Sequence, residues 1–327
     1  MNSKVKVVYL IDSWFPFVGG AQIHLREIQK QLESNKRISS SIYAPNHLNI
    51  FYRLFWSVWI VPLILWKNPS FDLIHSHGFH SGLSGKLLSV LSKKPVIHTV
   101  HGSHLLDKKQ ISLKALMEKF FLVNLRYDAI ITVSRKFKEH QPKTKKLFVV
   151  ANGVTIEEFT KEKVEKNGQP TLIFVGRNHP DKGIDVLEKV FNQLISKYPQ
   201  VRLTKIIDGN YSHKKLIKKY KQSHIFVLPS RAEGQPITLL EAWASKLPVV
   251  VSDVGENPFM VKNGVNGYVV ENGNVEALVE SISSLLDNPS QATRMGKNGF
   301  DLVKEKYTWK SIADTTFNLY QKVVKYD

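Results

Sequence analysis

The chain contains no cysteine among its 327 residues, which excludes disulfide bonds and metal sites built from thiolates. It also lacks a Gly-x-Gly-x-x-Gly segment, the usual fingerprint of dinucleotide binding. No Asp-x-Asp occurs, although a site that holds Mg²⁺ against a diphosphate usually needs a carboxylate cluster of that kind. We therefore expect no bound metal and no resident cofactor. Positive side chains would have to neutralise any bound diphosphate.

Acidic residues are also scarce. The chain has 28 of them against 46 lysines and arginines, which gives a net charge of +18. Such an excess draws a protein toward an anionic membrane surface, nucleic acid or anionic small ligands. No helix-turn-helix, zinc-finger or RNP motif is present, so we do not expect nucleic acid as a partner. Solvated surface charge explains the excess equally well.

Long apolar runs are missing. The most apolar run, residues 54–66, contains three tryptophans and is interrupted by Pro62. It is too short to span a bilayer, which takes about 20 apolar residues. The run fits either a helix packed on a sheet or an interfacial helix with its tryptophans at headgroup level. The first residues show no signal-peptide pattern, so we expect a cytoplasmic protein, with peripheral contact to the inner face of the cytoplasmic membrane as a further hypothesis.

Short β-branched runs alternate with longer helical stretches along the whole chain. The strand candidates are residues 5–11, 40–44, 73–75, 96–100, 129–133, 147–151, 171–175, 201–207, 224–228, 248–252 and 267–270. Most are continuously apolar, as strands buried on both faces require. The pattern predicts a doubly wound α/β architecture with parallel sheets.

The strand series is interrupted once, by a polar stretch that ends in Asn167-Gly168-Gln169-Pro170. This stretch is typical of a linker. We predict an N-terminal Rossmann-like domain over residues 1–157, a linker over 158–170 and a second Rossmann-like domain over 171–305. Ligands of such sheets bind beyond the carboxyl ends of the strands, and two facing domains would form a cleft.

Two acids bracket the most informative segment, Glu233-Gly234-Gln235-Pro236-Ile237-Thr238-Leu239-Leu240-Glu241. It follows an apolar strand and reads as a loop that opens a helix, with Pro236 suited to the first helical position. Such a helix directs its free N–H groups and the positive end of its dipole at the loop, which favours anions. The carboxylates are suited to accept hydrogen bonds from hydroxyl groups. A nucleotide sugar combines these features.

Glycines and basic residues follow the first strand of each half. Gly19 and Gly20 open a helix and permit close approach of a ligand, although a tight turn explains them as well. Gly176 and Arg177 end the strand 171–175, and Lys182 precedes the next helix. An arginine and a lysine there are placed to bind a diphosphate, the arginine bidentately.

Three histidines lie at strand ends. His101 could donate a hydrogen bond to a sugar or a phosphate. For His75 and His77 we expect structural or hydrogen-bonding roles, because no acidic partner lies at metal-ligand spacing.

Taken in order, these motifs resemble those of glycosyltransferase family 4, the retaining nucleotide-sugar glycosyltransferases with the two-domain GT-B fold. The stretches that carry the resemblance are Gly19-Gly20-Ala21-Gln22, residues 72–78, 99–102, 131–134 and 152–154, Gly176-Arg177 with Lys182-Gly183, residues 227–230 and 247–250, and the pair Glu233 and Glu241. The resemblance covers nearly the whole chain.

The resemblance implies a role for each matching residue. Arg177 and Lys182 would bind the donor diphosphate, with Gly176 beside them, and Gly20 would approach it from the other domain. Glu233 and the backbone of Gly234, Gln235, Pro236 and Ile237 would hold the donor sugar, which His101 would also contact. Glu241 would accept hydrogen bonds from ribose hydroxyls. Residues 306–327 would form a helix that crosses back to the first domain.

The implied activity is transfer of a hexose from a UDP- or GDP-linked sugar to a hydroxyl of a glycan or lipid-linked acceptor, with retention and without a metal, in polysaccharide biosynthesis. Compared with the family pattern, this chain lacks a segment in its second half. Only residues 211–219 stand where the family has a further helix and strand, so the second domain is predicted to be shorter by about one strand–helix unit. Two alternatives remain open: a shortened, catalytically impaired relative that binds a sugar or a partner, and a phosphorylase or sugar-phosphate-acceptor synthase.

Overall fold

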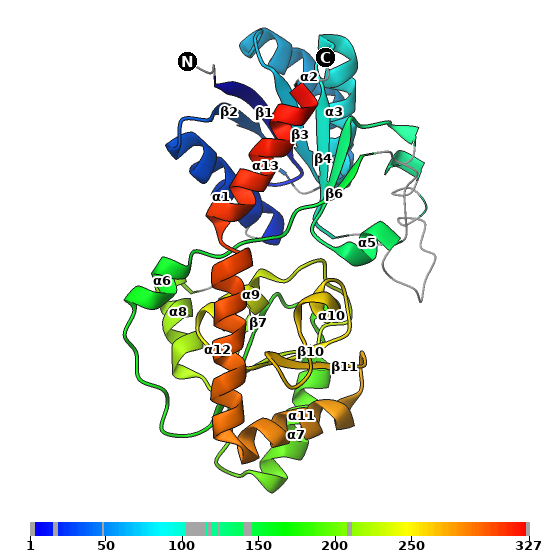
Figure 1. The fold of residues 1–327 in the computed structure, drawn as a ribbon. Coiled ribbons are helices and arrows are strands. Elements are labelled where there is room, and N and C mark those ends of the chain that lie inside the picture. Colours follow the sequence, from blue (N-terminus) through cyan, green and yellow to red (C-terminus); the bar gives the residue numbers. More distant parts are fainter. Residues whose placement is uncertain are drawn as a thin grey trace. The chain divides into compact units, whose positions relative to one another are not determined.

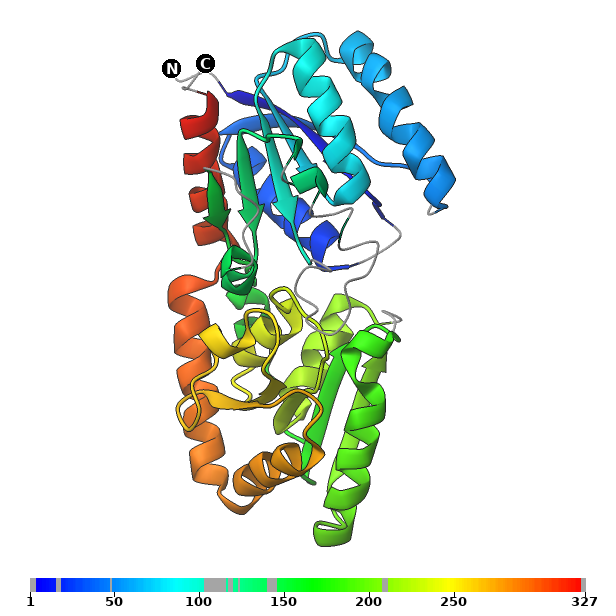
Figure 2. The same ribbon diagram turned by 90° about the vertical axis from the view of Figure 1, so that its right-hand side faces the viewer.

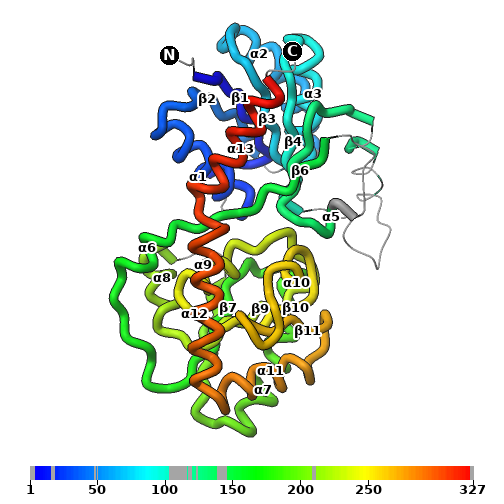
Figure 3. The backbone as a smooth tube through the Cα atoms, viewed as in Figure 1, coloured from blue at the N-terminus to red at the C-terminus, as the bar shows by residue number. Residues whose placement is uncertain are grey.

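A computed structural model describes residues 4–15, 19–47, 49–102, 116, 120–122, 124–139, 146–207 and 211–324. The chain divides into two compact units, each built around one parallel sheet (Figure 1). Unit 1 comprises Met1–Ala151 and Trp309–Asp327, and unit 2 comprises Asn152–Thr308. The chain therefore passes from unit 1 into unit 2 and returns for its last helix, as the trace in Figure 3 shows.

Unit 1 contains a six-stranded sheet in the order β2-β1-β3-β4-β5-β6, and all its neighbouring strands are parallel. The strands are β1 (Val5–Ile11), β2 (Ile38–Tyr43), β3 (Leu73–His77), β4 (Val96–Val100), β5 (Ala129–Thr132) and β6 (Leu147–Val149). The helices are α1 (Gly20–Ser34), α2 (Ile50–Lys67), α3 (Phe79–Ser92), α5 (Arg135–Glu139) and α13 (Trp309–Val324). Every residue of β3, β4 and β5 is buried, because helices cover both faces of the sheet.

The last helix of the chain is part of the core of unit 1. Helix α13 packs against α1, on the side of the sheet opposite α2 and α3 (Figure 2). Its Tyr320 hydroxyl lies 3.1 Å from the Tyr9 hydroxyl of β1 and 2.6 Å from Nδ1 of His75 in β3. All three side chains are buried, so the C-terminal segment closes a polar network inside the N-terminal unit.

Unit 2 contains a five-stranded parallel sheet in the order β11-β10-β9-β7-β8. Its strands are β7 (Thr171–Gly176), β8 (Arg202–Ile207), β9 (Ile225–Leu228), β10 (Val249–Ser252) and β11 (Gly267–Val270). Its helices are α6 (Ile156–Lys161), the 3₁₀ turn η2 (Pro180–Lys182), α7 (Ile184–Lys197), α8 (His213–Gln222), α9 (Ile237–Ala244), α10 (Asn257–Met260), α11 (Val275–Asp287) and α12 (Pro289–Lys306). Helix α9 packs on α12 and α8, while α7 packs on α11.

The predicted class, two Rossmann-like α/β units with parallel sheets, is confirmed. All eleven predicted strands are present, with bounds that differ by no more than two residues. The stretch 158–170 is not wholly a linker, because α6 extends into it as far as Lys161. After β8 ends at Ile207, the next described element is α8, and β8 lies at the edge of its sheet.

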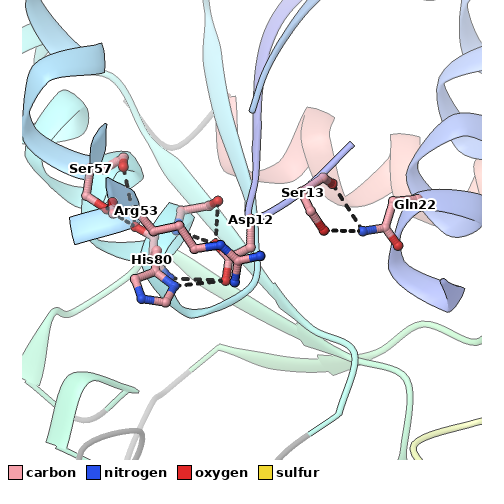
Figure 4. A network of polar contacts seen from close by, with 8 residues as sticks. Asp12, Ser13, Gln22, Arg53, Ser57 and His80 are labelled. Atoms are coloured by element: carbon pink, nitrogen blue, oxygen red, sulfur yellow. Dashed lines mark hydrogen bonds and ion pairs between the residues drawn. The ribbon is translucent and has the colours of Figure 1, made fainter. Parts of the chain in front are cut away.

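A carboxylate at the end of β1 caps helix α3. Asp12 accepts hydrogen bonds from the backbone N–H of Ser81 at 2.7 Å, from its hydroxyl at 2.6 Å and from the backbone N–H of His80 at 3.3 Å (Figure 4). Gly78, the N-cap residue, has no side chain to do this, and its φ of 97° favours glycine. A Cβ at Gly78 would lie 2.7 Å from the Asp12 carboxyl. Gly78 thus leaves space for the Asp12 carboxylate, which follows β1, to cap helix α3.

We predict that Asp12→Asn destabilises unit 1 by about 1 kcal/mol at neutral pH, because the amide nitrogen cannot accept from a backbone N–H. Burial raises the pKa of Asp12, but the hydrogen bonds from His80 and Ser81 outweigh it and leave the pKa below its usual value. The stabilisation is therefore complete above the usual aspartate pKa and is lost as the pH falls through the folded pKa. Urea unfolding at pH 7 and pH 3 should show a smaller difference between the variant and the wild type at pH 3. An undiminished difference would contradict the charge-dependent cap.

Candidate functional site

The loop at residues 229–236, which follows β9, is held from two sides by close backbone contacts. A Cβ at Gly183 would lie 2.0 Å from the Pro229 carbonyl oxygen, and one at Gly255 would lie 2.3 Å from the Glu233 carbonyl oxygen. Both glycines have positive φ, 64° and 55°. The Glu256 backbone N–H also donates to the Gly234 carbonyl at 2.8 Å. Only glycine permits this approach, so the loop has one fixed path.

Lys182 and Glu233 are in direct contact in unit 2. Lys182 Nζ lies 2.6 Å from Glu233 Oε1, and the Ser230 hydroxyl donates to the same oxygen at 2.8 Å. The Lys182 side chain is 16% exposed and that of Glu233 is 7% exposed. A partly buried ion pair loses much of its hydration and gives little net stability. The ion pair instead fixes positions, because it holds a positive and a negative group side by side at the carboxyl ends of β7 and β9.

Arg177 follows β7 directly and is exposed. No acid in the described part of the chain pairs with its guanidinium, so its positive charge is available to an anion. Gly176, which precedes it, lies against Lys182, since a Cβ there would be 3.6 Å from Lys182 Cγ. The end of β7 therefore carries the exposed Arg177 and lies beside Lys182, the cation that contacts Glu233.

Arg231 joins the two loops of this site, and sequence reasoning missed it. Its guanidinium makes a bidentate ion pair with Asp185, at 2.7 and 2.6 Å, and donates to the Pro180 carbonyl at 2.8 Å. Its backbone N–H donates to the Asp181 carbonyl at 2.7 Å. The turn that carries Lys182 is thus tied to the loop that carries Glu233. An exposed arginine between two motifs gives no sequence signal of such a contact.

Helix α9 begins at Ile237, so Pro236 is the N-cap residue and not, as we predicted, the first helical residue. Pro236 supplies no side-chain cap, which leaves the first-turn N–H groups without that partner. The Gln235 side chain is buried, accepts from the Asn152 backbone N–H and donates to Met260 Sδ at 3.3 Å. The Asn152 amide in turn donates to the Gln235 carbonyl at 2.7 Å. The Gln235 side chain therefore holds the loop in place. Because that side chain is engaged within the protein, Gln235 would contact a ligand through its backbone.

Glu241 lies one turn further into α9 and is buried, with 7% of its surface exposed. The Tyr220 hydroxyl of α8 donates to its Oε2 at 2.9 Å. Burial is the main cause that raises the pKa of Glu241 from 4.5 to about 7, against the lowering effects of His213 and the Tyr220 hydrogen bond. The two predicted acids thus lie in different surroundings: Glu233 is paired with a lysine, and Glu241 is partly protonated at neutral pH.

The predicted site residues of unit 1 lie at the carboxyl ends of its strands. Gly19 is the N-cap residue of α1, and a Cβ at Gly20 would meet no atom within 4 Å. Gln22, one turn into α1, donates to the Ser13 carbonyl at 3.1 Å and to its hydroxyl at 2.6 Å (Figure 4). The backbone at Gly20 is therefore open to close approach, and its contact with a ligand stays a prediction.

His101 belongs to a group of stacked imidazoles. Its Nε2 lies 2.9 Å from His77 Nδ1, and the two rings are nearly parallel. His75 lies between Tyr320 and Thr99, at 2.6 and 2.7 Å, in the hydrogen-bonding role that we expected. Burial, and next the neighbouring imidazoles, lower the pKa of His75, His77 and His101 well below the usual histidine value. The rings are neutral at pH 7, so His101 can exchange hydrogen bonds but offers no charge.

Comparisons with known proteins agree with this architecture. The model of the family described as Glycosyltransferase Family 4 matches residues 18–158, and the model described as Glycosyl transferases group 1 matches residues 204–301. The sucrose-phosphate synthase structure from Thermosynechococcus elongatus superposes with a TM-score of 0.83 at 20% identity and covers 99% of this chain and 100% of that one.

Two curated relatives are similar over most of their length. The UDP-Gal:alpha-D-GlcNAc-diphosphoundecaprenol alpha-1,3-galactosyltransferase of Escherichia coli is 27% identical over 73% of this chain and 74% of its own. The capsular polysaccharide biosynthesis glycosyltransferase CapM of Staphylococcus aureus is 27% identical over 80% of each chain.

The fold and the strand-end site define a transferase of the two-domain GT-B class. Within that class, the two family models, which match one stretch in each unit, and the glycosyltransferase relatives support a glycosyltransferase of the family 4 type. The resemblance inferred from the sequence motifs is thereby confirmed.

We predict that Gly183→Ala destabilises unit 2 by at least about 2 kcal/mol more than Gly273→Ala. Both glycines have positive φ, 64° and 82°, but only a Cβ at Gly183 meets the Pro229 carbonyl, whereas Gly273 faces open space. The control thus measures the backbone cost alone. Urea unfolding of both variants gives the difference, and equal losses would show that the loop yields to the added methyl group.

We predict that Glu241→Gln removes a pH dependence of stability. The folded carboxyl binds its proton more tightly than the unfolded one, so the contribution of Glu241 to stability is greatest below pH 4.5 and falls by about 3 kcal/mol as the pH rises to about 7. The free energy of unfolding, measured from pH 4.5 to pH 8, should lack this fall in Glu241→Gln and keep it in the exposed control Glu280→Gln. Parallel profiles for all three proteins would contradict the assignment.

Proposed function

We propose that the protein transfers a hexose from a UDP- or GDP-linked sugar to a hydroxyl of a glycan or lipid-linked acceptor, with retention of configuration and without a metal. The single observation that carries the proposal is the contact between Lys182 and Glu233 beside the exposed Arg177. It provides cations for a diphosphate and a carboxylate for sugar hydroxyls at one strand end. The proposal places the protein in the cytoplasm.

The diphosphate would lie at Arg177, Lys182 and the first turn of α9. Its charge needs compensation, which the guanidinium, the ammonium and the helix dipole supply. When the bond between the sugar and the diphosphate breaks, negative charge grows on the leaving oxygen. Fixed cations stabilise that charge without reorganisation, the part that a metal ion takes in other enzymes.

The sugar and the ribose would be held by the acids and the loop. Glu233 would accept hydrogen bonds from sugar hydroxyls, helped by the backbone of residues 234–237, while Glu241 would serve the ribose. Because Glu241 is partly protonated at neutral pH, a bound ribose that donates to it would favour its ionised form. By the resemblance, His101 would contact the sugar and Gly20 the diphosphate.

In the transfer step, the acceptor oxygen forms a bond to the anomeric carbon on the same face from which the diphosphate leaves. The acceptor hydroxyl passes its proton to the leaving diphosphate oxygen, so no protein nucleophile is needed. Binding energy is then used for alignment and for exclusion of water. The protein's part is to position the two substrates and to stabilise the leaving charge.

The names of the relatives support the substrate classes. The Escherichia coli relative is named for a UDP-linked donor and a diphosphoundecaprenol-linked acceptor, and the Staphylococcus aureus relative for capsular polysaccharide biosynthesis. We therefore favour a lipid-linked or glycan acceptor in the assembly of a polysaccharide. A catalytically impaired relative gains no support from the ion pair at the site, since nothing in the packing of unit 2 requires it.

We predict that Lys182→Ala and Glu233→Gln each lower turnover by about 100-fold or more, because each removes a group that meets the donor. Lys205→Ala is the matched control: it breaks another Lys–Glu ion pair of unit 2, at 2.7 Å from Glu188, on the surface. Turnover is measured with UDP- and GDP-hexoses and a panel of acceptors, with and without a chelator, and calorimetry with UDP and GDP reports binding.

Full turnover in Lys182→Ala would show that the site assignment is wrong. A chelator-sensitive reaction would refute the metal-free mechanism, and inversion at the anomeric carbon would refute retention. Sugar release to inorganic phosphate, or transfer only to a sugar phosphate, would replace the proposed reaction by the phosphorylase or synthase alternative. Absence of heat with either nucleotide would indicate a non-catalytic protein.

A further inference from the structure

Helix α2 is apolar on all sides, but the protein covers only one of its faces. Trp56, Ile60, Val61 and Ile64 are at most 7% exposed and pack into the core of unit 1. These buried side chains confirm one of the two interpretations drawn from the sequence, a helix packed on the domain. The remaining apolar residues of α2 need a separate explanation.

The opposite face of α2 exposes large apolar side chains to solvent. Phe51, Phe55, Val58, Trp59 and Trp66 recur at helical spacing and are exposed by 77%, 66%, 57%, 65% and 77%. On α3, the neighbouring Val90 and Leu91 are exposed by 62% and 58%. We call these seven residues the α2–α3 face. The two helices lie side by side, with α2 outermost (Figure 2).

A groove runs along this face. Its volume is about 570 Å³, and it is lined by Phe55, Val58, Trp59, Val61, Pro62, Leu87 and Leu91. No lining residue is polar. A contiguous apolar surface with exposed tryptophans is unusual in a protein that has no partner, and it marks an interaction site.

The charge around the face identifies the partner. Between Glu33 and Asp107, the sequence contains one acid, Asp72, and seven lysines and arginines. The Asp72 carboxylate is engaged with the Lys6 backbone N–H at 2.8 Å. Lys67 ends α2, and Lys93 and Lys94 follow α3, all exposed. Among the described residues, the exposed charged side chains at the ends of α2 and α3 that follow the apolar face are thus Lys67, Lys93 and Lys94, all positive.

We propose that the α2–α3 face binds the surface of an anionic phospholipid bilayer. The aromatic side chains would enter the headgroup and upper acyl region, and Lys67, Lys93 and Lys94 would meet lipid phosphates. A second copy of the chain is a poorer partner, because a two-fold contact would set the same basic border against itself. The helix lies on the bilayer and does not cross it: among the described residues, no helix is long and apolar enough to span a membrane.

The test is co-sedimentation of the full chain with vesicles, which needs no donor or acceptor and so is independent of the proposed transfer. We expect binding to phosphatidylglycerol–phosphatidylcholine vesicles that weakens with salt, and little binding to phosphatidylcholine alone. Lipids brominated along their acyl chains should quench tryptophan fluorescence most strongly at the shallowest bromine position.

Two pairs of variants locate the surface. Phe55→Ser/Trp59→Ser should weaken vesicle binding by at least about tenfold, whereas Ile195→Ser, which replaces a 39%-exposed residue of unit 2, should not. Lys93→Glu/Lys94→Glu should also weaken vesicle binding, and by more than the control Lys214→Glu/Lys215→Glu, which reverses two charges on the basic helix α8. All the substituted side chains are partly or fully exposed, and urea unfolding confirms that each variant is folded.

Three results would overturn the proposal. The first is equal binding by the wild type and Phe55→Ser/Trp59→Ser. The second is loss of binding in the α8 variant alone, which would move the contact to unit 2. The third is a dimer in analytical ultracentrifugation that dissociates in Phe55→Ser/Trp59→Ser, which would make the α2–α3 face a protein interface.

Discussion

The loops after β7 and β9 are held so that the charges of Lys182 and Glu233 stay in contact, and this constraint explains many of the contacts around them. Neither side chain is well hydrated, and an ion pair in such surroundings costs about as much in lost hydration as it returns in attraction. Packing alone therefore does not account for it. The backbone contacts of Gly183 and Gly255, the Arg231–Asp185 pair and the Asn152–Gln235 bonds all hold the two loops that bring the charges together. These contacts at the carboxyl ends of β7 and β9 thus fix the positions of the Lys182 and Glu233 side chains.

Helix α9 and the loop before it carry two acids with different electrostatic surroundings. Glu233 precedes α9 and has a cation and a hydroxyl as partners, whereas Glu241 lies inside α9 with a tyrosine. Glu233 is thus held in an ion pair, whereas burial raises the pKa of Glu241 to about 7. Two residues that look equivalent in the sequence are thus chemically distinct. A ligand that donates hydrogen bonds to both would have to compete with Lys182 for Glu233 and to promote ionisation of Glu241.

The sequence predicted the features that local patterns determine. Continuous apolar runs placed the strands, and residues that follow parallel strands gather at one sheet edge, so Lys182 and Glu233 could be expected near one another, although their ion pair was not predicted. Contacts between ordinary residue types far apart in the chain could not be predicted. Arg231 with Asp185, Tyr220 with Glu241, and Asp12 at the start of α3 depend on how loops and helices meet. For α2, composition allowed two interpretations because the helix is apolar all round, and only the structure separates its packed face from its exposed one.

The return of the chain into unit 1 has a consequence for how the protein is made. Helix α13 contributes Tyr320 to the buried network of Tyr9 and His75, yet it is the last described helix of the sequence. On the ribosome, all residues of unit 2 emerge before α13 does. The unit that is synthesised first therefore lacks part of the cover of one sheet face until unit 2 has been synthesised, and nascent chains need protection at that face. Unit 2, whose synthesis begins later, can therefore complete its fold before unit 1 does.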